Sequence, residues 1–320
     1  MEVAMTAVFS HRTGNTYRAS IVLTALLPLL MILAMPVTSW AHGFAGKRFF
    51  PTTLSVEDPF VSDELSFLFG HIKEDSVTKT TSLGLDYSKR ITPHFGISIG
   101  SEYQTVDVNH VGSESGFGNL ELGIKYQFLT SELNEAILSV GVGAEIGRTG
   151  SRRIGAESFS IISPALFFGK GFGDLPDSVK YLKPFAITGV IGPNFPTRAK
   201  TVSDGEIEYN PDTFSWGITL QYSLQYLQSF VTDIGLGAPL NRTVLLLEFP
   251  METCLNRGCK GQTTGFVNPG ITWVGKTMQF GIEAQIPINE RSGNHVGVLG
   301  LVHFFLDDMF PKSLGRPIFP

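Results

Sequence analysis

"GFGNLELGIKYQFL", residues 116–129, alternates polar and apolar side chains along its length. Glu121 and Lys125 fall on odd positions, whereas Leu122 and Ile124 fall on even positions. Such a period of two predicts a β-strand with one polar and one apolar face. In a soluble protein the apolar face would point toward a core. In an outer-membrane barrel it would point toward lipid, and the polar face would line a lumen.

Strand length decides between these two environments. Soluble strands average about 5–6 residues, whereas a barrel strand that crosses a bilayer at a tilt needs about 9–11. Alternation continues through most of residues 78–91, 213–226 and 278–288, well beyond the soluble average. The sequence therefore predicts an all-β fold: a single transmembrane antiparallel β-barrel of about 12 strands over residues 63–306. The predicted strands are 63–73, 78–91, 95–107, 117–129, 136–148, 159–172, 184–192, 213–226, 242–252, 265–274, 278–288 and 295–306.

Two further features favour a barrel over the remaining alternative, a secreted β-sandwich. Short connections such as residues 91–94 and 275–276 alternate with longer polar loops, as in barrels with short periplasmic turns and longer outer loops. Aromatic side chains lie near the ends of the apolar faces, where the girdles at the two membrane interfaces are expected. They are Tyr126, Phe128, Tyr222, Tyr226 and Trp273.

Residues 1–41 have the order of a secretory signal peptide. Arg12 and Arg18 precede the apolar run Ile21–Met35, and a small-x-small cleavage site ends at Ala41. The apolar run is shorter than the ~20 residues that a membrane-spanning helix needs. We therefore predict cleavage after residue 41, export, and a location in the bacterial outer membrane. An uncleaved membrane anchor is the alternative.

The segments on either side of the predicted barrel are irregular. Residues 42–62 lack alternation, and we expect this segment to enter the barrel as a partial plug or to lie beneath it. Cleavage would make His42 the first residue, and a terminal amine with its own imidazole can chelate copper. No second ligand can be identified for such a site, so neither a metal nor any other cofactor is predicted. Residues 307–320 form a C-terminal tail without a predicted role.

The two cysteines of the chain, Cys254 and Cys259, lie in one polar loop with the sequence CLNRGC. In an exported protein an even number of closely spaced cysteines predicts a disulfide. A metal site would need a second pair of ligands, which this loop lacks. We therefore predict a disulfide that closes the loop and has no catalytic role.

Seven charged residues fall on the polar faces of predicted strands. A charge on the lipid face of a barrel costs up to about 2–4 kcal/mol near the middle of the bilayer, so these side chains should point into the lumen. They are either selectivity residues of an acidic pore or a paired network that fills a narrow barrel. Twelve strands lie between the filled eight-stranded barrels and the open porins, so both interpretations stand. The seven are Asp86, Glu102, Glu121, Lys125, Glu145, Glu248 and Glu283.

An enzyme, such as an outer-membrane lipid hydrolase, is the alternative from a different class. It would need a histidine that activates a serine on the same face, with a third group orienting the imidazole. The tripeptide His-x-Ser does not occur in the chain, and no serine can be identified that faces one of the strand histidines. We therefore predict that the protein is not an enzyme. The histidines considered are His71, His94, His110, His295 and His303.

Two stretches resemble a known group of proteins. Glu121–Phe128, which follows a Gly-Phe-Gly turn, and the tight connection Arg90–Gly96 are similar to the outer-membrane barrels of the MetA-pathway of phenol degradation family. The resemblance covers residues 60–306 and assigns no functional residues one by one. It implies passive passage of small, apolar or aromatic solutes across the outer membrane.

The charge balance limits the partners. A net charge of −5 and the lack of lysine or arginine runs argue against nucleic acid. The expected partners are outer-membrane lipid, the barrel-assembly machinery and small solutes, and the oligomeric state is left open. The sequence thus favours a porin-like channel, with a structural or binding barrel as the alternative.

Overall fold

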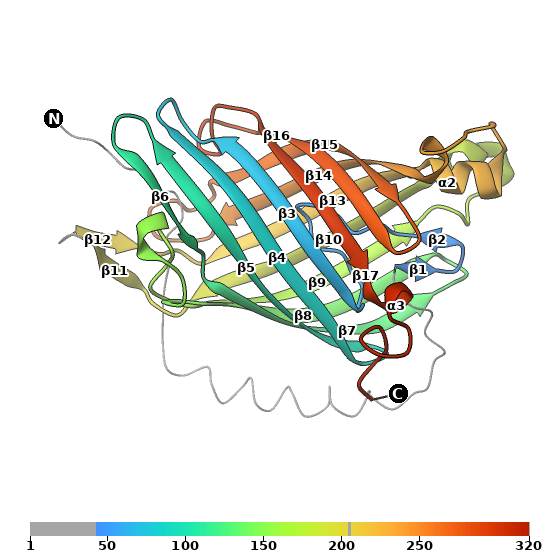
Figure 1. The fold of residues 1–320 in the computed structure, drawn as a ribbon, viewed down its shortest axis with the longest axis horizontal. Coiled ribbons are helices and arrows are strands. Elements are labelled where there is room, and N and C mark those ends of the chain that lie inside the picture. Colours follow the sequence, from blue (N-terminus) through green and yellow to red (C-terminus); the bar gives the residue numbers. More distant parts are fainter. Residues whose placement is uncertain (1–42, 204–205, 320) are drawn as a thin grey trace.

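The computed structural model describes residues 43–203 and 206–319, and its strands form a closed antiparallel barrel (Figure 1). Strand β3 pairs with β4 on one side and with β17 on the other, which closes the ring. Closure leaves no sheet edge and pairs the backbone groups within the wall, as a strand-built membrane protein requires. The prediction of a twelve-stranded all-β barrel is confirmed. The predicted signal peptide and His42 lie outside the described residues.

The barrel strands match the predicted ones to within a few residues. One difference is that the predicted strand 117–129 is interrupted, because β6 (Gly112–Phe117) and β7 (Leu120–Ser131) both pair with β5. The twelve strands of the ring are β3 (Glu64–Lys73), β4 (Thr78–Thr92), β5 (Phe95–Val108), β7, β8 (Ala136–Ile146), β9 (Ile161–Gly171), β10 (Phe185–Pro196), β13 (Thr213–Ser223), β14 (Thr243–Cys254), β15 (Thr263–Val274), β16 (Met278–Pro287) and β17 (Gly297–Phe305).

The two ends of the barrel carry different elements. We call the end where the described chain enters and leaves the base, and the opposite end the top. Two small hairpin strands, β1 (Phe44–Ala45) and β2 (Arg48–Phe49), lie at the base with the short helices α2 (Leu224–Tyr226) and α3 (Leu306–Met309). Strands β6, β11 (Lys200–Ser203) and β12 (Glu206–Tyr209) lie at the top (Figure 1). No helix in the described part of the chain is long and apolar enough to cross a membrane. The remaining elements are η2 (Arg152–Ile154), η3 (Asp177–Leu182), η4 (Leu227–Val231) and η5 (Leu240–Arg242).

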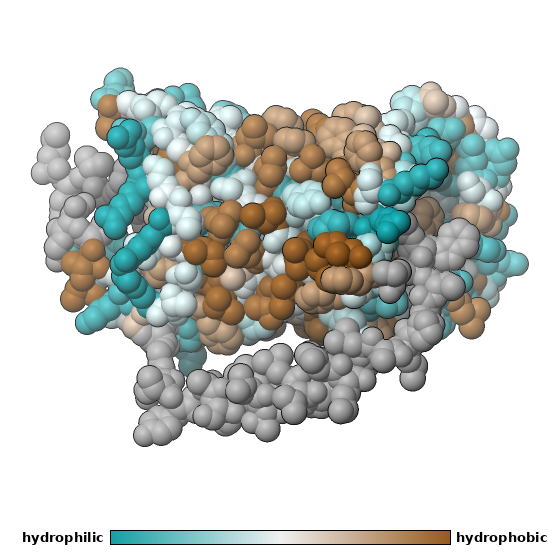
Figure 2. Space-filling view, turned by 60° about the horizontal axis from the view of Figure 1, so that its bottom comes forward, coloured by the Kyte–Doolittle hydropathy of each residue, from teal (hydrophilic) through white to brown (hydrophobic). Residues whose placement is uncertain are grey.

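The apolar side chains of the strands point outward. On β7, Leu122 and Ile124 are 41% and 47% exposed, although they belong to the most apolar face of the strand. In Figure 2 such side chains gather over the middle of the face in view, and hydrophilic ones lie toward both ends. A lipid-facing band between two polar rims is the surface expected of a membrane barrel. Exposed apolar residues of this band include Leu83, Leu85, Ile97, Ile99, Leu166, Leu220, Leu245, Ile271, Ile282 and Val298.

The predicted girdle position of Tyr226 is wrong. The strand expected to run to residue 226 ends at Ser223, whose side-chain oxygen accepts the backbone N–H of Tyr226 at 3.0 Å and caps the short helix α2. This cap turns the chain under the barrel, so Tyr226 is buried rather than facing a membrane interface.

Arg48 anchors the small hairpin to the base. Its Nε lies 3.1 Å from the carboxylate of Glu135, and its other nitrogens donate to the carbonyl oxygens of Lys183 and Pro184. Its guanidinium lies 3.8 Å from the ring centre of Tyr226, and the Tyr226 hydroxyl donates to Glu135 at 2.7 Å. Burial, followed by the hydrogen bond to Glu135, raises the pKa of Tyr226, so the phenol keeps the proton that it donates. Three connections at the base are thereby joined through one arginine.

The C-terminal tail docks on the base near the start of β3. Asp63 is fully buried and binds Lys89 at 2.5 Å and Arg90 at 2.8 Å. Arg90 also donates to the carbonyl oxygen of Gly315, and the backbone N–H of Phe319 donates to the carbonyl oxygen of Ile91 at 2.8 Å. The tail therefore covers an ion pair that holds the first barrel strand to β4.

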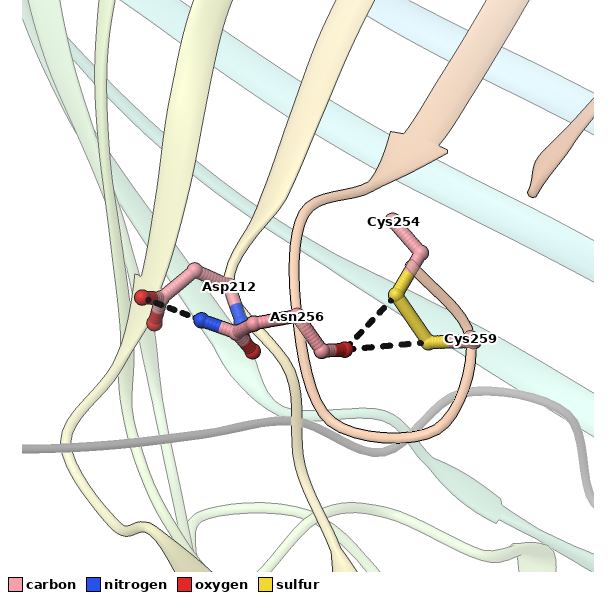
Figure 3. The surroundings of a disulfide bond; sticks show 4 residues. All are labelled: Asp212, Cys254, Asn256 and Cys259. Carbon is pink, nitrogen blue, oxygen red and sulfur yellow. Dashed lines mark hydrogen bonds between the residues drawn. A yellow bond between two sulfur atoms is a disulfide. The ribbon is translucent and has the colours of Figure 1, made fainter. Parts of the chain in front are cut away.

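The predicted disulfide between Cys254 and Cys259 is present at the top (Figure 3). The loop that it closes is tied to the preceding connection, because the side chain of Asn256 donates to the Asp212 carboxylate at 3.0 Å and accepts the Asp212 backbone N–H at 3.1 Å. The disulfide therefore holds a rim loop and is remote from the base.

We predict that Arg90→Ala destabilises the barrel by about 1.5–3 kcal/mol, because the fully buried Asp63 carboxylate loses its hydrogen bond from Arg90 while Lys89 still pairs with it. Urea unfolding of the detergent-folded protein, followed by the mobility difference between folded and heated samples, measures the change. Lys79→Ala removes an exposed lysine of the same strand and serves as the control. An equal effect of the two variants would contradict the role given to the Asp63–Arg90 pair.

Candidate functional site in the barrel lumen

Residues 50–63, which we call the inner segment, run inside the lower half of the barrel. The segment contacts strands on opposite sides of the ring: Ser139 of β8 donates to the carbonyl oxygen of Pro59, and Gln279 of β16 donates to that of Thr52 at 2.6 Å. Phe50 and Phe60 bury their rings against one another and against Ile137. A chain that touches both walls in this way occupies the lumen between them.

Glu248 on β14 holds the innermost turn of the inner segment. Its carboxylate accepts the backbone N–H groups of Leu54 at 2.8 Å, Ser55 at 3.0 Å and Val56 at 2.6 Å. The Glu248 side chain is fully buried, so these three donors would otherwise lack a partner. Hydrogen bonds to a charged acceptor are worth about 1.5–3 kcal/mol each, so three of them at one carboxylate hold this turn firmly.

Glu283 lies beside Glu248 and is almost fully buried. Room for it depends on Gly270 of the neighbouring strand, where an added Cβ would come within 2.3 Å of the Glu283 side chain. Of the seven predicted lumen residues, these two meet each other and the inner segment on one side of the barrel.

Lys125 on β7 approaches the inner segment from the opposite side. Its ammonium lies 2.7 Å from the Glu57 carboxylate and 2.8 Å from the carbonyl oxygen of Asp58, and 4.5 Å from the ring centre of Phe167. The Glu57 side chain is 62% exposed, so this side of the segment borders open space in the lumen. The charge of Lys125, the one basic residue of the predicted set, is therefore neutralised by Glu57 of the inner segment.

The other four predicted residues form an acidic wall. Gly100 of β5 lies opposite Asp86 of β4 and also opposite Glu121 of β7, which in turn lies opposite Glu145 of β8. These carboxylates therefore share one row across four strands, and Glu102 lies two residues from the row toward the top. None of the four forms an ion pair with a described residue, and their partners are neutral groups such as Asn119 and Ser88.

An apolar wall lies across the lumen from the acidic one. Leu54 of the inner segment packs there against Val244, Leu246, Leu299 and Leu301 of β14 and β17. Above this contact, a cavity of about 460 Å³ extends in the upper half of the barrel, with Leu54 and Ser55 as its floor. The inner segment thus closes one side of the lower lumen tightly and leaves the acidic side more open.

The prediction that no strand histidine faces a serine is wrong for His303. Its Nδ1 lies 2.8 Å from the hydroxyl of Ser66 on the neighbouring strand β3, and its Nε2 lies 3.3 Å from both Glu64 and Thr52. The imidazole is fully buried and touches the inner segment through Thr52. The pair was missed because β17 meets β3 only when the barrel closes, 237 residues apart in the chain.

The inner segment contributes groups that the sequence analysis did not select. Glu57 and the backbone of Leu54 to Val56 carry no motif, and only the lack of strand alternation in residues 42–62 indicated that this segment differs from the wall. Within residues 43–203 and 206–319, no three His, Cys, Asp or Glu side chains come together as a metal site would require.

We predict that Glu248→Ala speeds hydrogen exchange at the amides of residues 54–56 by at least about tenfold, since loss of even one charge-assisted hydrogen bond corresponds to that factor. Mass spectrometry of the folded protein in detergent measures the exchange. Glu252→Ala is the matched control, because Glu252 lies on the same face of β14 but contacts Asn194 and not the inner segment. Unchanged exchange in Glu248→Ala would show that other contacts hold the segment.

Comparison with known proteins identifies the fold. No family model matches the chain, and no curated protein matches it, so the resemblance to the MetA-pathway family stays a prediction. An outer membrane channel from Pseudomonas putida F1 is 13% identical, with 78% of this chain and 97% of that chain covered and a TM-score of 0.55. The KdgM porin (15% identity, 75% and 98% covered, TM-score 0.43) and the NanC porin (9%, 75% and 98%, TM-score 0.46) are also similar. The chain has the fold of a bacterial outer-membrane β-barrel.

Proposed function

We propose that the protein is a channel of the bacterial outer membrane through which small solutes pass. The observation that carries this proposal is the lumen itself: a cavity of about 460 Å³ in the upper half stands above a segment that only non-covalent contacts hold in the lower half. A barrel that served only as a scaffold would gain stability from a filled lumen. Here four lumen carboxylates have no cationic partner among the described residues, and one of them, Glu102, lines the cavity.

We propose that the inner segment acts as a partial plug. Its apolar side, at Leu54, seals against β14 and β17, whereas its polar side, at Glu57, pairs with Lys125 of β7 and borders the acidic wall. A solute that moves along the lumen therefore follows the acidic wall and passes the Glu57–Lys125 pair. The outward apolar band contacts outer-membrane lipid, and insertion of such a barrel implies the barrel-assembly machinery as a partner.

We propose that selectivity is set by the carboxylates of the acidic wall, whereas Glu248 and Glu283 hold the plug. Together with Lys125, which pairs with Glu57 of the inner segment, this assigns the seven residues predicted from sequence to the two roles that were left open. Passage of apolar or aromatic compounds is supported by the family resemblance only.

An enzymatic role is not part of the proposal. Ser66, His303 and Glu64 do form a hydrogen-bonded chain of the kind used by serine hydrolases. The imidazole, however, is fully buried and bonded to Thr52 of the inner segment, so a substrate would have to displace this contact to reach it. The three residues therefore act as another polar anchor of the plug.

We predict that Glu121→Gln/Glu145→Gln lowers the permeability ratio of K⁺ to Cl⁻ by at least about twofold, because two neighbouring charges are removed from the acidic wall. Reversal potentials in planar bilayers under a KCl gradient measure this ratio. Glu114→Gln on the exposed strand β6 removes a charge outside the wall and serves as the control.

Liposome swelling measures, alongside these recordings, whether small neutral and aromatic solutes pass through the protein. If neither the folded wild-type protein nor the folded Glu248→Ala variant passes ions or solutes, the channel is rejected and a structural or binding barrel is favoured. A double variant that conducts with unchanged ion preference would reject the selectivity role alone.

We predict that a fluorophosphonate probe leaves Ser66 unlabelled in the folded protein, since the neighbouring imidazole is enclosed. Mass spectrometry of the labelled protein tests this, with Ser66→Ala as the matched blank and a known serine hydrolase as the positive control. Labelling that disappears in Ser66→Ala would restore the hydrolase alternative.

A further inference from the structure

The cavity in the upper half of the lumen has the dimensions of a small-molecule site. Its volume of about 460 Å³ lies within the range of about 300–1,000 Å³ that is typical of ligand pockets. The inner segment closes it from below at Leu54 and Ser55, so a solute that enters from the top meets this cavity before it meets the plug. A chemical preference of the cavity would therefore act as the first filter on solutes.

One part of the cavity is apolar. Leu68 of β3, Leu299 of β17 and Phe266 of β15 line it together with Leu54 of the floor. Leu54, Leu68 and Leu299 also pack against one another in the apolar cluster below, so these side chains are held in place. Such a surface favours the apolar body of a ligand, through burial of its area and contact with the Phe266 ring.

Another part of the cavity is negative. Glu102 of β5 lines it, and the only described partner of its carboxylate is the amide of Gln104. Glu102 also lies near Glu121, the middle of the carboxylate row, which continues below the cavity. Lys125, which could offset this charge, is engaged by Glu57 and Asp58 of the inner segment and does not line the cavity.

We infer that this cavity binds a small organic cation, an ammonium group on an apolar or aromatic body, before the solute passes the inner segment. The inference deepens the proposed channel function and rests on it. The apolar residues hold the body of the ligand, and Glu102 receives the ammonium in place of a protein cation. An anion of the same shape meets the same apolar surface but is repelled by Glu102 and by the row below it.

Three ligands of one shape and different charge test the inference: phenethylammonium, 2-phenylethanol and phenylacetate. Their affinities for the full-length, detergent-folded protein are measured by titration calorimetry at low and high salt. We expect the ammonium to bind at least tenfold more tightly than the alcohol, the carboxylate to bind most weakly, and the preference to shrink as salt rises.

Two variants separate the parts of the site. Glu102→Gln should weaken binding of the ammonium about tenfold and leave the alcohol unchanged, whereas Phe266→Ala should weaken both. Glu290→Gln removes a carboxylate from the connection between β16 and β17 at the top and serves as the matched control, without effect on any of the three. The mobility difference between folded and heated samples verifies that each variant has folded.

Equal binding of the three ligands, or an ammonium affinity that Glu102→Gln leaves unchanged, would overturn the inference. Failure of this inference and failure of the channel are distinguishable. If solutes pass in the liposome-swelling assay but calorimetry shows no preference for the ammonium, the cation site is rejected and the channel stays in place. Tight, Glu102-dependent binding of the ammonium without any passage would retain the site and reject the channel.

Discussion

The contact between the Glu248 carboxylate and three successive backbone N–H groups of the inner segment is the interaction on which the arrangement of the lumen depends. A chain inside a barrel has no ladder of its own, so its backbone donors must find partners in the wall or in water. One buried carboxylate supplies three such partners at once. By holding the turn at residues 54–56, it also fixes Leu54 against the apolar side of the lumen.

Small residues on the wall make this position possible. The lumen-facing glycines Gly217 and Gly281 lie where an added Cβ would come within 2.9 Å of Val56 and 2.8 Å of Leu54. Such distances are shorter than van der Waals contact, so a larger residue at either position would push the inner segment away from its anchor. The glycine-rich polar faces of the strands therefore serve the fit of the inner segment as well as the width of the lumen.

The position of the inner segment makes the two sides of the lumen unlike. Where Leu54 packs, the wall is apolar and closed. Where Glu57 and Lys125 meet, the wall is polar and continues upward into a row of carboxylates that have no cationic partner among the described residues. Charges in a dry, filled core would carry a large desolvation penalty unless they were paired. The unpaired carboxylates are consistent with a lumen that water reaches, which is the setting that a passage for polar or charged groups needs.

The features that depend on residues close together in the sequence could be predicted from the sequence. Alternation along a strand is local, so the strand positions and the outward band that includes Leu122 and Ile124 followed from the order of residues alone. The disulfide also followed, because Cys254 and Cys259 are only five residues apart in an exported type of sequence. The end of β13 was misplaced because Ser223 caps a helix there, and a single capping serine within an alternating stretch is a weak signal.

By itself the sequence determined an outward-apolar barrel of long strands, and it determined which side of each strand carries the charges. Only the tertiary structure decided which charges meet, because residues far apart in the chain become neighbours when the ring closes. Closure brings Ser66 to His303, and the entry of the inner segment brings Thr52 to the same histidine across 251 residues. The same packing separates Glu248, which is buried against the segment, from Glu121, which faces open lumen. Both residues look alike in a strand pattern, since periodicity reports the face of a side chain and not what lies opposite it.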